Sequence, residues 1–197
     1  MRGSGVRISM GPPKHTLLEL YMNKTNLELK HYCSYFVNVR KVLSKIGAKK
    51  DVVKRQVDYF FELPNKTGSV SPRMKLRVEG RVKTLIYYER PDFVKAKDTT
   101  SDIKLYNVKD NNLLPFLERS LGVKVIVDKK REVWREANTV FHLDNVKDVG
   151  GIFEIELQKK GKINEKDKKL FAYYQKELLP YLGDVIKGYN VDLVKKQ

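Results

Sequence analysis

The sequence predicts an α+β domain: an eight-stranded antiparallel β-barrel, or tunnel, with a polar, charged lumen and helices packed on its outside. Two observations support this fold class. In several segments charged residues alternate with aliphatic ones, so one face of each strand is charged. Most connections between these segments are short, as between antiparallel strands. A sheet whose charged face is open to water would show the same periodicity, so the pattern alone leaves that alternative standing.

The strands are recognised by their two-residue periodicity. Near the start, Glu28 and Lys30 alternate with Leu27 and Leu29, and this places the charged pair on one face. Gly80 marks the turn of a hairpin between two such segments. The expected strands cover residues 26–32, 54–63, 73–79, 82–90, 103–108, 123–135, 139–144 and 152–158.

Three segments between the strands have the periodicity of amphipathic helices. In the first, Val39 and Leu43 belong to an apolar series at helical spacing. The second ends before Gly122, and the third is expected to break near Pro180. The expected helices cover residues 38–48, 110–121 and 162–182.

Charge and composition narrow the class of protein. The formal net charge of +16 predicts attraction to anions such as nucleic acid, acidic lipid or polyphosphate, without choosing among them. Cys33 is the only cysteine, which excludes an intrachain disulfide and fits a cytoplasmic location. No apolar run approaches the roughly 20 residues of a membrane span, so no membrane partner is expected. Residues 1–13 are expected to be flexible or added by cloning, and residues 14–197 to form one domain, either monomeric or homodimeric.

Acidic residues at alternate strand positions are the candidate metal ligands. Glu154 and Glu156 share one face of the last strand, and Glu28 lies on a charged face of the first. Asp144 ends the preceding expected strand, residues 139–144. Carboxylates of this kind suit Mg²⁺ or Mn²⁺, which use a few carboxylates, keep waters and bind substrate phosphates in the remaining positions. Acids two residues apart are also common on solvated strands, which is the plainer interpretation.

Basic residues on several strands are the candidate phosphate ligands. Lys75 and Arg77 lie two residues apart, as do Lys129 and Arg131, so each pair shares a face. A charged strand face is usually solvated, but pairs from several strands facing one lumen would clamp a multiply charged anion. The candidates are Lys30, Lys75, Arg77, Arg90, Lys129 and Arg131.

Other residue types offer weaker candidates. His142 alternates with Phe141 and Leu143 and is expected to be a hydrogen-bonded residue of the lumen rather than a catalytic one. Cys33 has no evident base partner and is expected to be a packing residue. No glycine-rich phosphate-binding loop is present, so phosphate binding at a helix N-terminus is not indicated.

Six segments occur in the order expected of a CYTH domain, and the chain resembles that family over about residues 24–193. The superfamily includes class IV adenylyl cyclases, thiamine triphosphatases and tripolyphosphatases, the triphosphate tunnel metalloenzymes. The most specific segment is residues 141–157, FHLDNVKDVGGIFEIEL. The others are residues 26–30 (NLELK), 74–79 (MKLRVE), 85–92 (LIYYERPD), 101–103 (SDI) and 129–134 (KKREVW), and residues 188–193 (GYNVDL) resemble the tail motif.

The resemblance implies a tunnel that binds a triphosphate through inward lysines and arginines, with Mg²⁺ or Mn²⁺ on inward acids. By position, it implies metal binding by Glu28, Asp144, Glu154 and Glu156, catalytic roles for Lys30, Glu28 and Glu156, and phosphate binding by the six basic candidates above. Two positions depart from the family pattern. Asn26 stands where the first acid is expected, and Glu89 stands where a lysine is expected, with Arg90 beside it. Arg90 replaces that lysine only if the strand is locally shifted.

The functional prediction is a divalent-metal-dependent triphosphatase that hydrolyses tripolyphosphate, a nucleoside triphosphate or thiamine triphosphate. Hydrolysis is preferred because it needs a water and a metal rather than a fixed nucleoside. The alternative is a class IV adenylyl cyclase, which would convert ATP to cyclic AMP and pyrophosphate with nearly the same residues. A second alternative is a non-catalytic triphosphate- or nucleic-acid-binding protein, whose nucleic-acid binding would weaken steeply with salt.

Overall fold

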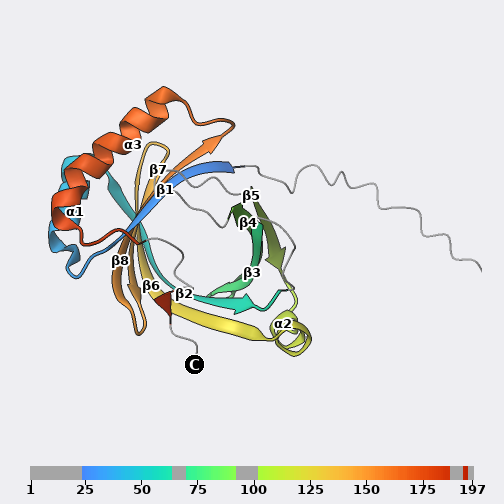
Figure 1. The fold of residues 1–197 in the computed structure, drawn as a ribbon. Coiled ribbons are helices and arrows are strands. Elements are labelled where there is room, and N and C mark those ends of the chain that lie inside the picture. The colour runs from blue at the N-terminus through green and yellow to red at the C-terminus, as the bar shows by residue number, and fades with distance from the viewer. Residues whose placement is uncertain (1–23, 64–69, 92–101, 187–192, 195–197) are drawn as a thin grey trace, which may run out of the picture.

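Eight strands and three α-helices make up the part of the chain that the computed structural model describes, residues 24–63, 70–91, 102–186 and 193–194. The strands form one antiparallel sheet that curls round into a half-barrel (Figure 1). The predicted fold class is therefore confirmed. Residues 1–13 and nearly all of the tail motif at 188–193 lie outside the described residues.

The sheet is continuous from one edge strand to the other. Its strands are β1 (Lys24–Tyr32), β2 (Lys49–Phe61), β3 (Val70–Glu79), β4 (Val82–Pro91), β5 (Asp102–Val108), β6 (Val123–Glu136), β7 (Thr139–Val146) and β8 (Gly150–Lys160). Their spatial order is β1-β8-β7-β6-β2-β3-β4-β5. β2 begins at Lys49 rather than at residue 54, because β6 provides backbone partners as far as the pair Lys49–Arg135. The strands β1 and β8, far apart in sequence, are therefore neighbours.

The helices are α1 (Phe36–Lys45), α2 (Leu113–Leu121) and α3 (Glu165–Leu178), followed by a 3-10 turn over Leu179–Tyr181. Asn164 begins α3 with a capping box: its side chain accepts from the Asp167 backbone, and the Asp167 side chain accepts from the Asn164 backbone. The α-helix ends two residues before Pro180, in agreement with the predicted break. None of the helices in the described chain has the length and apolar character needed to cross a membrane.

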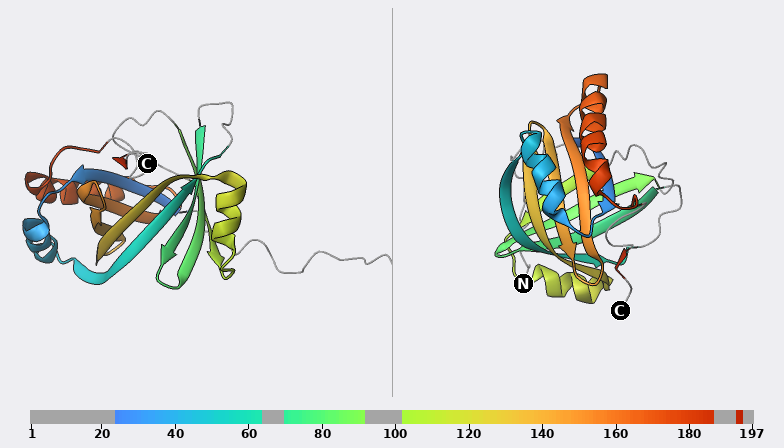
Figure 2. Two further views of the ribbon diagram at one scale, coloured as in Figure 1. Left: turned by 90° about the horizontal axis from the view of Figure 1, so that it is seen from below. Right: turned by 90° about the vertical axis from the view of Figure 1, so that its left-hand side faces the viewer.

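The main apolar core lies on the outside of the curl, between the sheet and two of the helices. α1 and α3 lie side by side against the outer face of the sheet, whereas α2 lies near the opposite end (Figure 2). Phe141 of β7 stacks on Phe153 of β8 at 6.4 Å between ring centroids and meets Tyr174 of α3 edge-on at 5.2 Å. Because the apolar residues of these strands face outward, the alternating charged residues must face inward.

Close packing joins the start of β8 to the loop after β1. The Cys33 backbone N–H donates to the Gly151 carbonyl at 2.9 Å. A Cβ atom at residue 151 would lie 2.0 Å from the Cys33 carbonyl oxygen, so only glycine fits this approach. The contact helps hold the charged face of β8 against that of β1.

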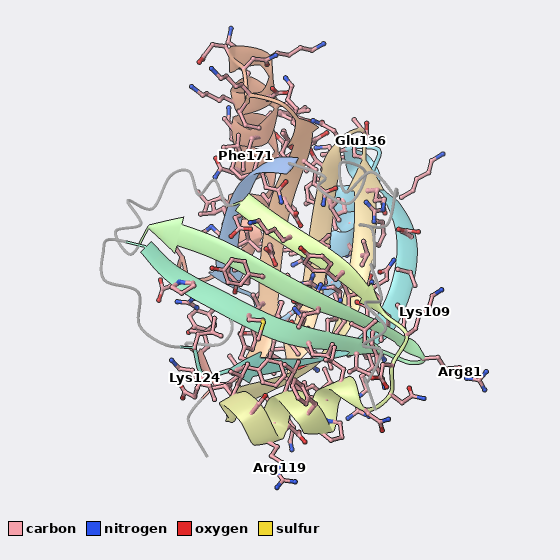
Figure 3. The ribbon with its side chains drawn as sticks, turned by 90° about the vertical axis from the view of Figure 1, so that its right-hand side faces the viewer. Arg81, Lys109, Arg119, Lys124, Glu136 and Phe171 are labelled. Atoms are coloured by element: carbon pink, nitrogen blue, oxygen red, sulfur yellow. The ribbon has the colours of Figure 1, made fainter. Side chains whose placement is uncertain are left out.

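Much of the remaining charge lies on the outer surface. Arg81, in the turn between β3 and β4, and Arg119 of α2 extend away from the sheet (Figure 3). These side chains contribute to the net charge without entering the curl.

Candidate functional site

Inward-facing residues of all eight strands line a cavity of about 340 Å³ inside the curl. This volume lies within the usual range of small-molecule sites. Its charged wall comes from β1, β2, β3, β6 and β8, together with His142 of β7. At the rim, Lys54 pairs with Glu79 at 2.9 Å and Arg135 with Asp51 at 2.7 Å.

In the described part of the chain, five cations and five carboxylates lie in the interior of the curl, inside the pairs at the rim. The cations are Lys30, Lys75, Arg77, Lys129 and Arg131, and the carboxylates are Glu28, Asp58, Asp144, Glu154 and Glu156. Taken together the ten groups are formally neutral, because the two sets are equal in number. The charges are distributed unevenly, however: nine of them fall into three clusters, the first two joined by Arg131 and Glu154, and Glu156 lies apart from these.

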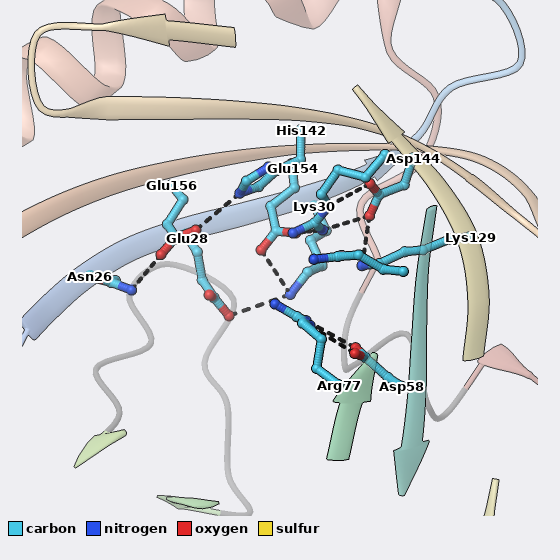
Figure 4. Close-up of polar contacts among 12 residues, drawn as sticks. Asn26, Glu28, Lys30, Asp58, Arg77, Lys129, His142, Asp144, Glu154 and Glu156 are labelled. Carbon is cyan, nitrogen blue, oxygen red and sulfur yellow. Dashed lines mark hydrogen bonds and ion pairs between the residues drawn. The ribbon is translucent and has the colours of Figure 1, made fainter. Parts of the chain in front are cut away.

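In the first cluster, Lys30 lies between two carboxylates. Its Nζ is 3.4 Å from Glu28 Oε1 and 3.2 Å from Glu154 Oε1 (Figure 4). Glu154 also lies 3.2 Å from Arg131 Nη2. Burial alone would raise the pKa of Glu154, but the charges of Lys30 and Arg131 outweigh it and hold that pKa well below its usual range. Glu154 is therefore a carboxylate shared by two cations.

In the second cluster, Asp144 is fully buried between two cations. Arg131 donates to it from Nε and Nη2, both at 2.6 Å, and Lys129 Nζ lies at 3.0 Å. Burial opposes its ionisation, but the charges of Arg131 and Lys129 lower its pKa. For Lys129, burial dominates and lowers its pKa to about 8. The structure thus makes Asp144 the counter-ion of the later basic pair, and metal binding by Asp144 stays a prediction.

In the third cluster, Asp58 of β2 pairs with both basic residues of β3. Lys75 Nζ lies 2.7 Å from its Oδ2, and Arg77 donates from Nε at 2.7 Å and from Nη2 at 2.9 Å. One carboxylate therefore serves two cations. Burial and the neighbouring Arg77 outweigh Asp58 and lower the pKa of Lys75 to about 7. This cluster carries a formal surplus of positive charge.

Sequence reasoning missed Asp58, although a signal for it was present. Lys54, Gln56 and Asp58 occupy alternate positions of one strand and all line the cavity. The aromatic residues that follow in that strand are typical of a packed core, and they mask the polar alternation. Gln56 is also buried and donates to Glu79. The polar face of β2 is thus part of the site.

Glu156 is surrounded by polar donors rather than by cations. Asn26 Nδ2 donates to its Oε1 at 2.6 Å, and Gln158 Nε2 donates to the same oxygen at 3.0 Å. His142 Nε2 lies 3.1 Å from its Oε2, and burial, together with Arg131, lowers the pKa of His142. The prediction that His142 is a hydrogen-bonded residue of the lumen agrees with this contact.

The acids of β1 and β8 have the chemistry of a site for a hard cation. Glu28 and Glu156 are direct partners in the antiparallel register, on the cavity face. Oδ1 of the buried Asn26 has no hydrogen-bond partner among the described residues, so an amide oxygen is available beside them. No three His, Cys, Asp or Glu side chains in the described chain are grouped so that they could hold a metal ion. Mg²⁺ does not require such a group, since it binds through one or two carboxylates with waters and substrate phosphates.

Seven of the predicted site residues line the cavity: Lys30, Lys75, Arg77, Arg131, Glu28, Glu154 and Glu156. Asp144 adjoins the wall through Arg131, and Lys129 contacts Asp144. The side chains of Glu89 and Arg90 lie outside the described part of the structure. In the backbone register, Ser71 pairs with Arg90.

A curled antiparallel sheet enclosing paired acids and bases defines a barrel-like protein with an ionic interior. A sequence model of the CYTH domain matches residues 24–187, and the chain belongs to this family. Its resemblance to the family, first seen in the motifs, is therefore confirmed. A search of curated proteins finds no match.

Solved structures share the fold. One is a Pyrococcus horikoshii protein, 21% identical with a TM-score of 0.69, where the match covers 86% of this chain and 99% of that one. Another is a putative adenylate cyclase from Vibrio parahaemolyticus, 15% identical with a TM-score of 0.60, covering 86% of this chain and 97% of that one. A third is a putative adenylyl cyclase from Hippeastrum described as having a dominant triphosphatase activity, 15% identical with a TM-score of 0.51, covering 78% of this chain and 87% of that one.

Proposed function

We propose that the protein is a divalent-metal-dependent triphosphatase that hydrolyses a triphosphate within the curl of the sheet. The observation that carries the proposal is the formal balance, among the described residues, of five inward-facing cations and five inward-facing carboxylates. A polyanion alone would enter this interior without net attraction and would displace carboxylates from their cations. A polyanion accompanied by divalent cations preserves the balance, because each incoming charge finds a partner.

The cations are positioned to exchange partners in this way. Lys30 and Arg131 both contact Glu154, from β1 and β6 respectively. When a metal takes up the charge of Glu154, these two cations can turn to phosphate oxygens. Lys75 and Arg77 already share a single carboxylate and would contact phosphate with the least rearrangement. Arginine would give bidentate contacts, and lysine a point charge.

The acids proposed as metal ligands are Glu28, Glu154 and Glu156, with one or two of them serving each ion and waters and phosphate oxygens in the remaining positions. The Asn26 amide oxygen lies where the family pattern expects an acid. A bound Mg²⁺ or Mn²⁺ would supply charge neutralisation at the phosphate oxygens and acidify a coordinated water. Replacing an acid by Asn26 removes one negative charge from that set. His142 and Gln158 hold Glu156 in place through its two oxygens, so its orientation is fixed before ligand binding. This preorganisation is what electrostatic catalysis of phosphoryl transfer requires.

Hydrolysis is preferred over cyclisation on the chemistry of the site. It requires a bound triphosphate and a water, whereas cyclisation also requires a ribose hydroxyl held near the α-phosphorus. The Hippeastrum protein of the same fold, described by its dominant triphosphatase activity, is consistent with that preference. Adenylyl cyclase activity is the second candidate, since the same cations and acids would serve it.

The test is to incubate the purified protein with Mg²⁺ or Mn²⁺ and either tripolyphosphate or ATP, and to separate the products. Orthophosphate release is expected, and cyclic AMP with pyrophosphate would identify a cyclase instead. Glu156→Gln should abolish turnover while the protein stays folded. Glu62→Gln, which changes a carboxyl group that is 53% exposed outside the cavity, is the matched control.

Two results would contradict an enzymatic function. Tight triphosphate binding with no turnover, under either metal, would identify a triphosphate-binding protein. Nucleic-acid binding that falls steeply with salt and is unchanged in Glu156→Gln, without triphosphate binding, would favour a nucleic-acid-binding protein.

A further inference from the structure

One side of the cavity carries no described charge. β4 contributes Ile86 and Tyr88 to the lining, and β5 contributes Ile103 and Leu105. The register pairs Ile86 with Leu105 and Tyr88 with Ile103, so the four side chains form one continuous block. We call this block the β4–β5 wall. All described cavity-lining side chains of these two strands belong to it.

The β4–β5 wall adjoins the third cluster, formed by Asp58, Lys75 and Arg77. Lys75 of β3 is the direct register partner of Ile86 in β4 and of Phe60 in β2. Phe60 also lines the cavity, and Lys75 Nζ lies 5.1 Å from the centre of its ring. A phosphate held by Lys75 therefore has apolar side chains on both flanking strands.

Inorganic triphosphate cannot use such a wall. It carries charged oxygens along its whole length. Apolar side chains would remove water from these oxygens without offering a hydrogen bond in exchange. An apolar ring in the organic group esterified to the α-phosphate would gain from the same contact. Ile86 and Tyr88 are each 7% exposed, whereas Leu105 is 43% exposed. The β4 side of the wall is thus buried, whereas Leu105 on the β5 side is exposed and could be covered by a ligand.

The geometry points to an organic triphosphate whose neutral, flat ring packs on the β4–β5 wall while its phosphates lie on the cationic clusters. The inference rests on the proposed function and selects within it a substrate class, ring-bearing triphosphates over tripolyphosphate. The α-phosphate would lie nearest Lys75, since that lysine borders the wall. Leu105 and Ile103 are then specificity-determining residues that contact the ring but not the phosphates.

Three ligands provide the test: tripolyphosphate, methyl triphosphate and ATP, each with Mg²⁺. Methyl triphosphate has the phosphate ester of ATP without its ribose and adenine. Dissociation constants, or KM where a ligand is turned over, are measured for the unsubstituted protein and for Leu105→Ser. The variant should weaken ATP binding by about tenfold, the usual scale for losing apolar contact in a pocket. It should change the affinity for the other two ligands by less than about twofold.

Tyr106→Ser is the matched control. It removes a large side chain of the same strand, 40% exposed, from the face opposite the cavity, and should not alter discrimination among the ligands. If Leu105→Ser does not fold, Ile103→Thr replaces it, because it retains a branched side chain suited to a strand.

The outcomes separate this inference from the proposed function. If Leu105→Ser weakens the binding of all three ligands equally, or of none, the wall stabilises the fold and does not contact the ring. Tighter binding of tripolyphosphate than of ATP would also overturn the inference, and the proposed function would stand. Absence of binding for all of these triphosphates would instead refute the proposed function itself.

Discussion

Replacing Asp58 by asparagine tests whether the buried charges of the site depend on one another. Asp58 is 2% exposed and accepts from Lys75 and from two nitrogens of Arg77, at 2.7–2.9 Å. Asparagine has nearly the same shape and keeps one acceptor oxygen, so the change removes the charge and little else. It leaves two cations close together without their shared counter-ion.

The expected cost follows from burial. Removing one partner of a buried ion pair usually destabilises by about 3–5 kcal/mol, because the remaining charge is left without compensation. We expect about 3 kcal/mol for Asp58→Asn, at the lower end, since the amide oxygen keeps a hydrogen bond and Lys75 can lose its proton. The pKa of Lys75 is already lowered to about 7, so neutral lysine is accessible.

An exposed pair of similar geometry supplies the control. Asp128 of β6 accepts from Arg55 of β2 at 3.0 and 2.6 Å, also in a bidentate arrangement, but the Arg55 side chain is 74% exposed. Exposed pairs of this kind often contribute nothing measurable. Asp128→Asn should therefore leave the stability almost unchanged.

Urea unfolding measures the stability that each variant loses, as the free energy of unfolding extrapolated to water. Tripolyphosphate with Mg²⁺ should restore part of the loss in Asp58→Asn, because phosphate can replace the missing carboxylate beside Lys75 and Arg77. A loss below about 1 kcal/mol, or equal losses in the two variants, would refute the reasoning from burial.

Two further predictions concern the same structure. Because only protonated Lys75 attracts phosphate and its pKa is about 7, affinity for Mg-tripolyphosphate should fall by up to about tenfold per pH unit above that value. The terminal phosphate, with a second pKa of about 6, is already ionised there. Calorimetry on Lys75→Arg should show a flatter profile; an unchanged profile would remove Lys75 from the explanation. Gly151→Ala should unfold or strongly destabilise the protein, since its Cβ would lie 2.0 Å from the Cys33 carbonyl oxygen. Thermal melting of Gly161→Ala, where no atom lies within 4 Å of the Cβ, should show only a backbone cost of about 1–2 kcal/mol. Similar losses in both would contradict the steric argument.

The sequence predicts the inward and outward faces of this fold well, because alternation in a strand is a local property. The charged face of residues 26–30 and the apolar face around Phe153 and Ile155 could both be assigned without a structure. Strand pairing is not local. That Glu28 faces Glu156, and Lys30 faces Glu154, depends on β1 lying beside β8, and the sequence separation gives no indication of it.

The ion-pair partners of the site residues were harder to predict from the sequence, because strand pairing is not local. Asp144 was predicted as a metal ligand from its place in a motif, but the structure shows two cations bound to it. Asp58 was missed because its partners, Lys75 and Arg77, are on another strand. A residue type and a strand face can be inferred from spacing. Which acid neutralises which base depends on the register of strands distant in sequence.

The uneven distribution of the ten charges indicates a direction for substrate binding. Near Asp58 there are two cations for one carboxylate, and burial together with the charge of Arg77 lowers the pKa of Lys75. Around Lys30, the acids of β1 and β8 outnumber the cations, and Glu156 is held by neutral donors. A triphosphate would therefore extend from the surplus cations of β3 toward the acids, where divalent metal would have to accompany it. The β4–β5 wall lies at the cationic end of this path, so the organic group enters beside Lys75 and the terminal phosphate lies nearest Glu28 and the other acids.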